Sequence, residues 1–258
     1  MTYATIDERC QRIAQKAFLR NVERGEAYQS EAPSLWDVTF RTAVAQAELE
    51  DRDQPSAYHQ LKFRSSSSGE DIIIDTTRPE LLPACVALVA HPEDARYQNL
   101  FGTSAITPLF GVEVPILAHQ LADPEKGTGI AMVCTFGDTT DVTWWRELEL
   151  PVRAIIDRSG RVISDAPEVI TSQSGKEAFS AIAGKTVFSA KKEVVRLLQE
   201  SDEMVGDPRP ITHAVKFFEK GDRPLEIVTS RQWYIKNGGR DTDLNRELIA
   251  RGDEMRWH

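Results

Sequence analysis

The sequence of 258 residues predicts a mixed α and β fold, with a β-barrel-like core, peripheral helices and a helical or extended stalk built from both chain ends. Many short β-rich runs separated by turn residues fill residues 57–157, which favours a closed or nearly closed barrel over a doubly wound sheet. Helical periodicity is confined to segments that interrupt or flank these runs. With 41% hydrophobic and 28% charged residues, the chain has the composition of a globular domain with a full core.

The first predicted element is a helix within residues 5–26, where apolar residues recur near one stripe and Gly25 supplies a stop signal. The segment 36–43 follows, and then a short acidic helical or extended piece. The strand-like runs lie at residues 59–63, 71–75, 86–90, 105–108, 112–117, 129–134 and 154–156. Helical insertions are predicted at 79–85 and 141–148, and further helices at 187–200 and near 242–251.

These elements predict three domains. Residues 1–52 form an N-terminal connecting helix and stalk, residues 53–205 the barrel domain, and residues 206–258 a returning stalk segment with a C-terminal helix. No apolar run approaches the length needed to span a bilayer, and the N-terminus lacks the apolar region of a secretory signal. Three scattered cysteines form neither a disulfide framework nor a metal-binding spacing, so a reducing cytoplasm fits best.

The charge of the chain limits its partners. A formal net charge of −9 argues against broad electrostatic capture of nucleic acid, because phosphate binding needs clustered Lys and Arg. If RNA is the partner, the contact must be local.

Two motifs carry the chemical information. Residues 73–80 read Ile-Ile-Asp-Thr-Thr-Arg-Pro-Glu, and residues 127–141 read Gly-Thr-Gly-Ile-Ala-Met-Val-Cys-Thr-Phe-Gly-Asp-Thr-Thr-Asp. Each is an apolar strand-like run that breaks into small hydroxyl, Gly and Asp residues, as a strand does when it delivers polar groups to the mouth of a pocket. Two such ends can converge on one small polar ligand.

In this order, about fifty residues apart, the motifs resemble the paired signature of the editing domain of class I aminoacyl-tRNA synthetases of the valyl, isoleucyl and leucyl group. The segment Ser230-Arg231-Gln232-Trp233 is similar to the valyl branch. The His-x-Gly-His and Lys-Met-Ser-Lys-Ser motifs of the synthetic site are absent from the sequence, so it resembles an excised fragment with no ligase activity.

The resemblance implies hydrolysis of the aminoacyl ester of mischarged Thr-tRNA(Val). The expected partners are the 3′ end of tRNA(Val) carrying a misattached amino acid and the remainder of the synthetase. Threonine is nearly isosteric with valine, and a hydrophobic pocket rejects the extra hydroxyl by only about 10², a magnitude known for this enzyme family itself. Two alternatives stay open: an isoleucyl-type editing domain that cleaves Val-tRNA(Ile), and a non-catalytic insertion that only binds the tRNA end.

The resemblance also assigns residues. It implies that Asp141 holds the ammonium group of the aminoacyl ester and that Asp138 meets the threonine hydroxyl or positions water; the alternative for Asp138 is an N-cap. Thr76 and Thr77 offer hydroxyl and backbone donors. The cation Arg78 can reach a phosphate or ribose, and the remaining predicted binding residues are Glu80, Gly127, Thr128, Gly129, Met132 and Cys134.

The chain departs from its relatives where Leu81, Met132 and Gly137 stand in place of more polar residues, so Asp138, Thr76 and Cys134 are expected to carry more of the threonine recognition. No nucleophilic triad is evident, which favours direct attack by water on the ester. The family's tRNA ribose hydroxyl is thought to assist that water. Trp144 and Trp145 have two interpretations, stacking on the terminal adenine or packing in the core.

We expect no cofactor and no metal. The family commonly has a zinc corner built from two pairs of cysteines. At the corresponding positions this sequence has Asp37, Phe40, Phe218 and Gly221.

Overall fold

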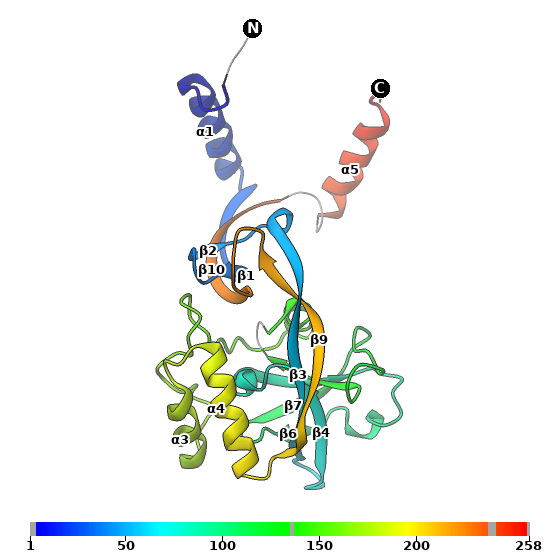
Figure 1. Cartoon of the computed structure of the whole chain (residues 1–258). Coiled ribbons are helices and arrows are strands. Elements are labelled where there is room, and N and C mark those ends of the chain that lie inside the picture. The colour runs from blue at the N-terminus through cyan, green and yellow to red at the C-terminus, as the bar shows by residue number, and fades with distance from the viewer. Residues whose placement is uncertain (1–3, 135–136, 237–240, 257–258) are drawn as a thin grey trace. The chain divides into compact units, whose positions relative to one another are not determined.

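The structure, a computed structural model, describes residues 4–134, 137–236 and 241–256 and contains two compact units. One unit combines residues 1–32 with residues 229–258, and the other comprises residues 33–228. The mixed α and β class predicted from the sequence is confirmed, and Figure 1 shows the order of the elements along the chain. Among the described residues, no helix has both the length and the apolarity needed to cross a bilayer.

The helices are α1 (Glu8–Glu23), α2 (Thr139–Glu147), α3 (Gln173–Ile182), α4 (Val187–Glu200) and α5 (Thr242–Asp253), with 3-10 turns η1 (Gln46–Glu48), η2 (Pro79–Ala84) and η3 (Gln98–Leu100). The strands are β1 (Ala27–Asp37), β2 (Thr42–Ala43), β3 (Leu49–Ser65), β4 (Asp71–Thr76), β5 (Cys85–Ala90), β6 (Ser104–Ile106), β7 (Glu113–Ala118), β8 (Ile130–Cys134), β9 (Met204–Phe218) and β10 (Glu226–Ile235).

The unit of residues 33–228 is built on one curled sheet. Its strand order is β4-β3-β6-β7-β5-β8, with β9 pairing along β3. All pairs are antiparallel except β5 with β7. The end strands β4 and β8 contact each other, so the sheet curves back on itself as the barrel prediction requires. The carboxyl ends of both motif strands therefore lie close together.

The main core fills the inside of this sheet. Fully buried side chains from the strands, among them Leu61, Phe63 and Leu88, pack with the apolar faces of α3 and α4. A second cluster on the other side of β5 and β8 includes Val133 and Trp144. Because every residue of β5 is buried, that strand reads as a continuous apolar run in the sequence.

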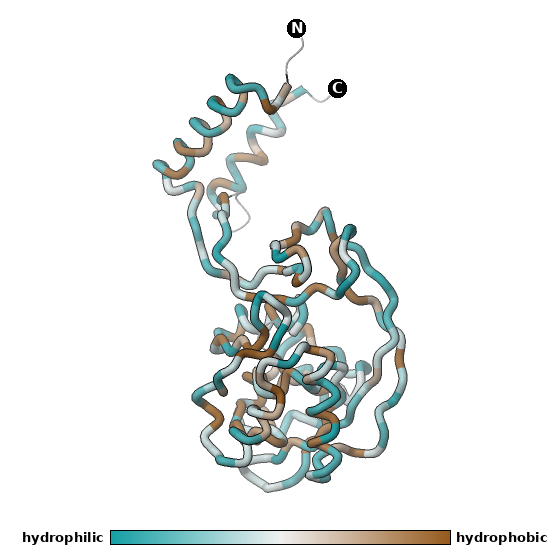
Figure 2. Tube along the Cα trace, turned by 60° about the vertical axis from the view of Figure 1, so that its left-hand side comes forward, coloured by the Kyte–Doolittle hydropathy of each residue, from teal (hydrophilic) through white to brown (hydrophobic). Residues whose placement is uncertain are grey.

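The unit formed by the chain ends contains α1, α5 and the outer parts of β1 and β10. Phe18 of α1 packs edge-on against Trp233, with ring centroids 5.0 Å apart, and Tyr28 stacks on Tyr234 at 5.9 Å. Neither helix has a buried residue. Figure 2 shows hydrophobic and hydrophilic residues alternating along α1, as expected for an amphipathic helix.

Four elements differ from the sequence prediction. The run at residues 154–156 forms no strand, only an isolated bridge between Ile156 and Val162. Strand β3 starts at Leu49 rather than near residue 59, and β9 fills residues that the sequence suggests are only an exit segment. These strands form a ladder from Leu49↔Phe218 to Leu61↔Met204 in which most residues are exposed or half-buried, so no regular alternation of buried apolar residues marks it in the sequence. Helix α3 was also missed; Ser172 caps it by accepting a hydrogen bond from the Gly175 amide at 3.1 Å.

Candidate functional site

A cavity of about 1150 Å³ lies within the unit of residues 33–228 and is lined by both motifs. The structure brings together ten of the eleven residues that the sequence singles out. They are Thr76, Thr77, Arg78, Glu80, Gly127, Gly129, Met132, Cys134, Asp138 and Asp141. Thr128 is not among the lining residues.

The end of β4 is held by contacts within the protein. Thr76 is buried, and its hydroxyl oxygen accepts a hydrogen bond from the Arg78 amide at 3.0 Å. The Thr76 carbonyl lies 3.3 Å from Nδ1 of the buried His59. Burial lowers the pKa of His59, with a further contribution from the charge of Lys191, so the ring is favoured in its neutral form. The Thr77 carbonyl accepts a hydrogen bond from the Lys191 ammonium at 2.7 Å.

Arg78 joins three separate segments. Its guanidinium donates to Glu80 at 3.0 Å, to Glu226 of β10 at 2.8 Å and to the Gly137 carbonyl at 3.2 Å. The side chains of Glu80 and Glu226 are 2% and 12% exposed, so both ion pairs are shielded from water. Although burial opposes its charge, the pKa of Arg78 is raised by Glu226 and Glu80. Arg78 therefore connects the first motif to the second through its hydrogen bonds.

The second motif continues into α2. The Asp138 carboxylate accepts a hydrogen bond from the Asp141 amide at 2.8 Å, which makes Asp138 the N-cap of α2. The N-cap alternative for Asp138 is therefore confirmed. Asp138 is exposed and lines the cavity.

Asp141 lies in the first turn of α2, and only 7% of it is exposed. Burial raises the pKa of Asp141 well above its ordinary value, and the nearby charge of Asp138 adds to the effect. In the part of the chain that the structure describes, no ion pair involves Asp141. A Cβ atom on Gly137 would collide with the Asp141 carboxylate as it lies in this structure, so the two residues are in close contact.

The wall between the motifs is apolar. Leu81, Met132 and Cys134 are buried and line the cavity. Cys134 faces Cys85 across the β5–β8 ladder, and both thiols are free. Burial raises the pKa of Cys134, and contact with Cys85 raises it further, so this thiol is not an activated nucleophile.

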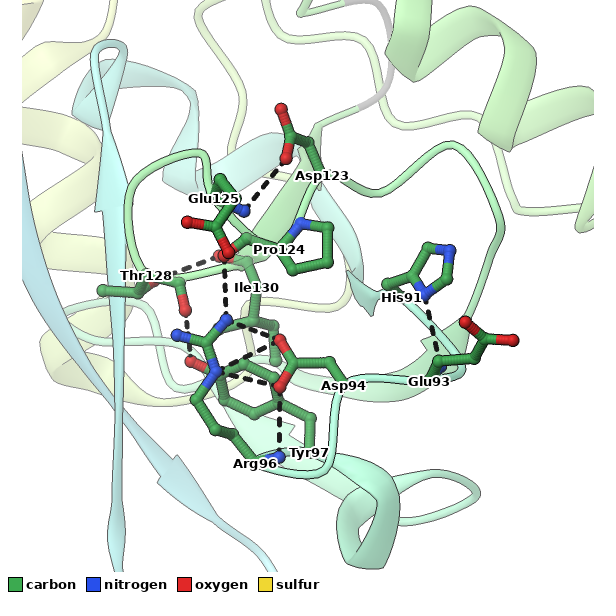
Figure 3. Close-up of polar contacts among 10 residues, drawn as sticks. All are labelled: His91, Glu93, Asp94, Arg96, Tyr97, Asp123, Pro124, Glu125, Thr128 and Ile130. Atoms are coloured by element: carbon green, nitrogen blue, oxygen red, sulfur yellow. Dashed lines mark hydrogen bonds and ion pairs between the residues drawn. The ribbon is translucent and has the colours of Figure 1, made fainter.

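A clamp holds the loop of residues 123–129 that carries Gly127 and Gly129, as Figure 3 shows. The Arg96 guanidinium pairs with Asp94 at 2.6 Å and donates to the Pro124 carbonyl at 2.8 Å. The Tyr97 hydroxyl donates to the Thr128 carbonyl at 2.6 Å.

The two glycines have left-handed backbone angles, with φ of 59° at Gly127 and 82° at Gly129. A Cβ atom on Gly127 would lie 2.9 Å from Cβ of Asp75, and one on Gly129 would collide with the Arg96 guanidinium. The backbone at these glycines therefore lies close to other parts of the protein itself. The side chain of Thr128 donates to the Ile130 carbonyl at 3.3 Å.

Trp144 belongs to the second core cluster, where its indole donates to Nδ1 of His119 at 3.2 Å. Trp145 packs against the same cluster. The core interpretation of the two tryptophans thus agrees with the structure.

Lys191 and Glu226 were not predicted from the sequence. Both line the cavity, yet they come from α4 and β10, far along the chain from either motif. No local pattern marks them.

The positions that correspond to the zinc corner do meet in space. Phe40 packs edge-on against Phe218 with ring centroids 5.6 Å apart, and a Cβ atom on Gly221 would lie 2.6 Å from Oδ2 of Asp37. Asp37 accepts hydrogen bonds from the amides of Thr39 and Phe40 at 2.8 and 2.7 Å. These residues supply one carboxylate where zinc needs about four nitrogen or sulfur ligands, so they do not fit the metal.

The chain is similar along its whole length to valine–tRNA ligases. It is 65% identical over 257 residues to the one from Thermobifida fusca and 66% identical over 257 residues to the one from Leifsonia xyli, covering 29% and 30% of their lengths. The valine–tRNA ligase of Cutibacterium acnes is 62% identical over 255 residues. The resemblance to the valyl branch is therefore confirmed, for a segment that spans less than a third of those relatives.

No family model matches the sequence. Among solved structures, a ternary complex of LeuRS, tRNA and LeuAMS from Agrobacterium radiobacter K84 has a TM-score of 0.44 and 16% identity, over 82% of this chain and 33% of that chain. This likeness is too weak to support an argument.

Proposed function

We propose that this chain is the editing domain of a valyl-tRNA synthetase and that its cavity hydrolyses the ester of threonine misattached to the 3′ end of tRNA(Val). The proposal is supported by the similarity to valine–tRNA ligases and by the chemistry of the cavity. The proposed site of action is the cytoplasm, as part of the longer synthetase.

The observation that carries the proposal is the buried carboxylate of Asp141. A carboxylate taken out of water without a cation is unfavourable, which is why its pKa is raised. An aminoacyl ester brings an α-ammonium group that would supply the missing cation through a charge-assisted hydrogen bond. Asp141 thus selects for an esterified amino acid rather than for a neutral acyl group.

The remaining groups suit hydrolysis without a covalent intermediate. In this proposal the second carboxylate oxygen of Asp138 accepts a hydrogen bond from a water molecule or from the threonine hydroxyl. Cys134 is favoured as a thiol and His59 is neutral and bonded to the backbone, so neither is an activated nucleophile or a free base. Water therefore attacks the ester carbonyl, the ester bond to the ribose oxygen breaks, and that oxygen leaves with a proton.

The selection of threonine over valine would arise from polar groups in an otherwise apolar cavity. Valine in the same place would cover the Asp138 carboxylate without donating a hydrogen bond to it, whereas the hydroxyl of Thr76 already accepts one from the Arg78 amide. An unpaired buried polar group costs about 1–3 kcal/mol, which corresponds to roughly 5- to 150-fold discrimination.

A deacylation assay tests the proposal. We expect the chain to hydrolyse Thr-tRNA(Val) and to spare Val-tRNA(Val), because the selection resides in the cavity. Replacing Asp141 by Ala should lower kcat/KM by about 10- to 150-fold, the value of a charge-assisted contact of roughly 1.5–3 kcal/mol. The matched control is Asp71→Asn, which removes an exposed carboxylate from the start of β4.

Three outcomes would contradict the proposal. Preferential cleavage of Val-tRNA(Ile) would favour the isoleucyl alternative. No hydrolysis of any ester by the chain joined to its synthetase would favour the non-catalytic insertion. Activity of Asp141→Ala within about threefold of wild type would remove the ammonium role of Asp141.

A further inference from the structure

The first turns of α4 carry an aromatic and basic surface at the rim of the cavity. Phe188 lines the cavity and is 68% exposed, the largest exposure of a large apolar side chain among the described residues of the 33–228 unit. Phe188 makes no contribution to the core that α4 covers with Ala190, Val194 and Leu198. The packing of the fold therefore gives no reason for an aromatic ring at residue 188.

Two lysines accompany this ring. The Lys192 ammonium lies 4.4 Å from the centroid of the Phe188 ring, within the range of a cation–π contact. The Lys191 ammonium donates to the Thr77 carbonyl and carries three N–H donors in total, so two remain for other acceptors. Among the described residues, neither lysine forms an ion pair with a carboxylate, in a chain whose net charge is −9.

We infer that Phe188, Lys191 and Lys192 form a subsite for the single-stranded 3′-terminal nucleotides of the RNA: a base stacks on the Phe188 ring and the lysines contact phosphate. This inference rests on the proposed function, because the ester and the terminal nucleotides belong to one substrate. A positive, aromatic surface is complementary to single-stranded nucleic acid, whose bases stack on aromatic rings and whose phosphates pair with lysines.

The position of the surface supports this occupant. Lys191 contacts Thr77 of the first motif, so the surface is continuous with the part of the cavity that the ester would enter. Arg161 also lines the rim, and its guanidinium donates to the Gly184 carbonyl just before α4. Local contacts of this kind reconcile RNA binding with an acidic chain.

The test measures binding of a fluorescent RNA oligonucleotide ending in CCA by anisotropy, with no ester present. Phe188→Leu should weaken binding by about 5- to 100-fold, whereas Phe188→Trp should retain it, because only an aromatic ring stacks on a base. Lys192→Gln should reduce the slope of log K against log salt by about 0.7, the value for one lost phosphate contact to a single strand. Phe188→Leu should leave that slope unchanged.

The matched control is Lys176→Gln, which removes an exposed lysine from α3. Equal affinity of Phe188→Leu and wild type would overturn the inference, as would failure of the wild-type chain to bind the RNA at millimolar concentration. Equal binding of polyphosphate and RNA would also overturn it, because the surface would then be a simple anion site.

Hydrolysis of Thr-tRNA(Val) is measured separately. If hydrolysis is absent but the binding pattern holds, the proposed function fails and the subsite stands. If hydrolysis occurs and Phe188→Leu changes neither binding nor KM, the subsite fails and the proposed function stands.

Discussion

The two motif ends reach the same cavity, but their charges are treated in opposite ways. At the end of β4, Arg78 is paired with Glu80 and Glu226 in a shielded network. At the start of α2, Asp141 is equally shielded but has no cation among the described residues. The carboxylates at the first end are paired with a cation of the protein, although Oε2 of Glu80 has no hydrogen-bond partner among the described residues, whereas the Asp141 carboxylate at the second end has no such cation among them. We therefore infer that the first motif mainly shapes the site and that the second binds the ligand.

The largest effect on the free energy of unfolding should come from the end of β4, where Arg78 forms its ion pairs. Arg78→Met removes the shared partner of two buried carboxylates, and breaking a buried ion pair typically lowers the free energy of unfolding by about 3–5 kcal/mol. Chemical denaturation measures this change. Arg78→Met combined with Glu80→Gln and Glu226→Gln should recover much of the loss, because no buried carboxylate is then left unpaired. If the Arg78→Met chain has the same free energy of unfolding as wild type, the ion pairs of Arg78 do not stabilise the end of β4. The contrast with Asp141 would then be lost.

A second test concerns the clamped loop between the motifs. Gly129→Ala forces a left-handed angle on alanine and pushes a Cβ atom into the Arg96 guanidinium. We expect a loss of about 1–2 kcal/mol in the free energy of unfolding, measured by denaturation. Gly184→Ala is the matched control, since Gly184 has a φ of 69° but nothing within 4 Å of its Cβ position. A larger loss at residue 184 than at residue 129 would remove the role given to the clamp.

The smallest effect on the free energy of unfolding is expected from Asp141, at the end of the second motif, because its carboxylate has no cationic partner among the described residues. Because the pKa of Asp141 is raised in the folded state, its protonation favours folding below its ordinary pKa of about 3.9, and this contribution disappears as pH rises through the folded-state value. Asp141→Asn removes the buried charge, so it should raise the free energy of unfolding at neutral pH by about 0.5–2 kcal/mol. Thermal melts at several pH values measure the difference.

Asp141→Asn should also lose the hydrolysis of the ester. Its gain in the free energy of unfolding over wild type should vanish in acid, because Asp141 is then protonated in the wild-type chain. A destabilised Asp141→Asn chain at neutral pH would mean that the carboxylate is already compensated in the protein.

The sequence was sufficient to predict the convergence of the two motifs, because apolar periodicity located β4 and β8 and the turn residues located their ends. The capping role of Asp138 was one of two interpretations open from the sequence, since Asp three residues before a helical amide is a common local signal. These predictions depend on short-range patterns.

Contacts between residues far apart in the sequence could not be predicted from short-range patterns. Glu226 and Lys191 enter the cavity only because β10 and α4 are brought to it by the fold, and neither residue has a local signature. The mostly exposed or half-buried β3–β9 ladder was missed for the same reason. The domain boundaries at residues 52 and 205, and the functional roles of the site residues, are still predictions.

A carbon NMR titration of the Asp141 carboxyl group measures its pKa directly. It therefore tests whether this carboxylate binds the ammonium group of the ligand. In the free chain, we predict a pKa of Asp141 above its ordinary value of about 3.9. With a saturating non-hydrolysable analogue in which threonine is joined to adenosine through an amide, the pKa should fall, because the ammonium favours the charged carboxylate. An acetylated analogue without the ammonium should not lower it. A pKa of Asp141 that is ordinary in the free chain, or that the two analogues change equally, would refute the ammonium-binding role of this carboxylate.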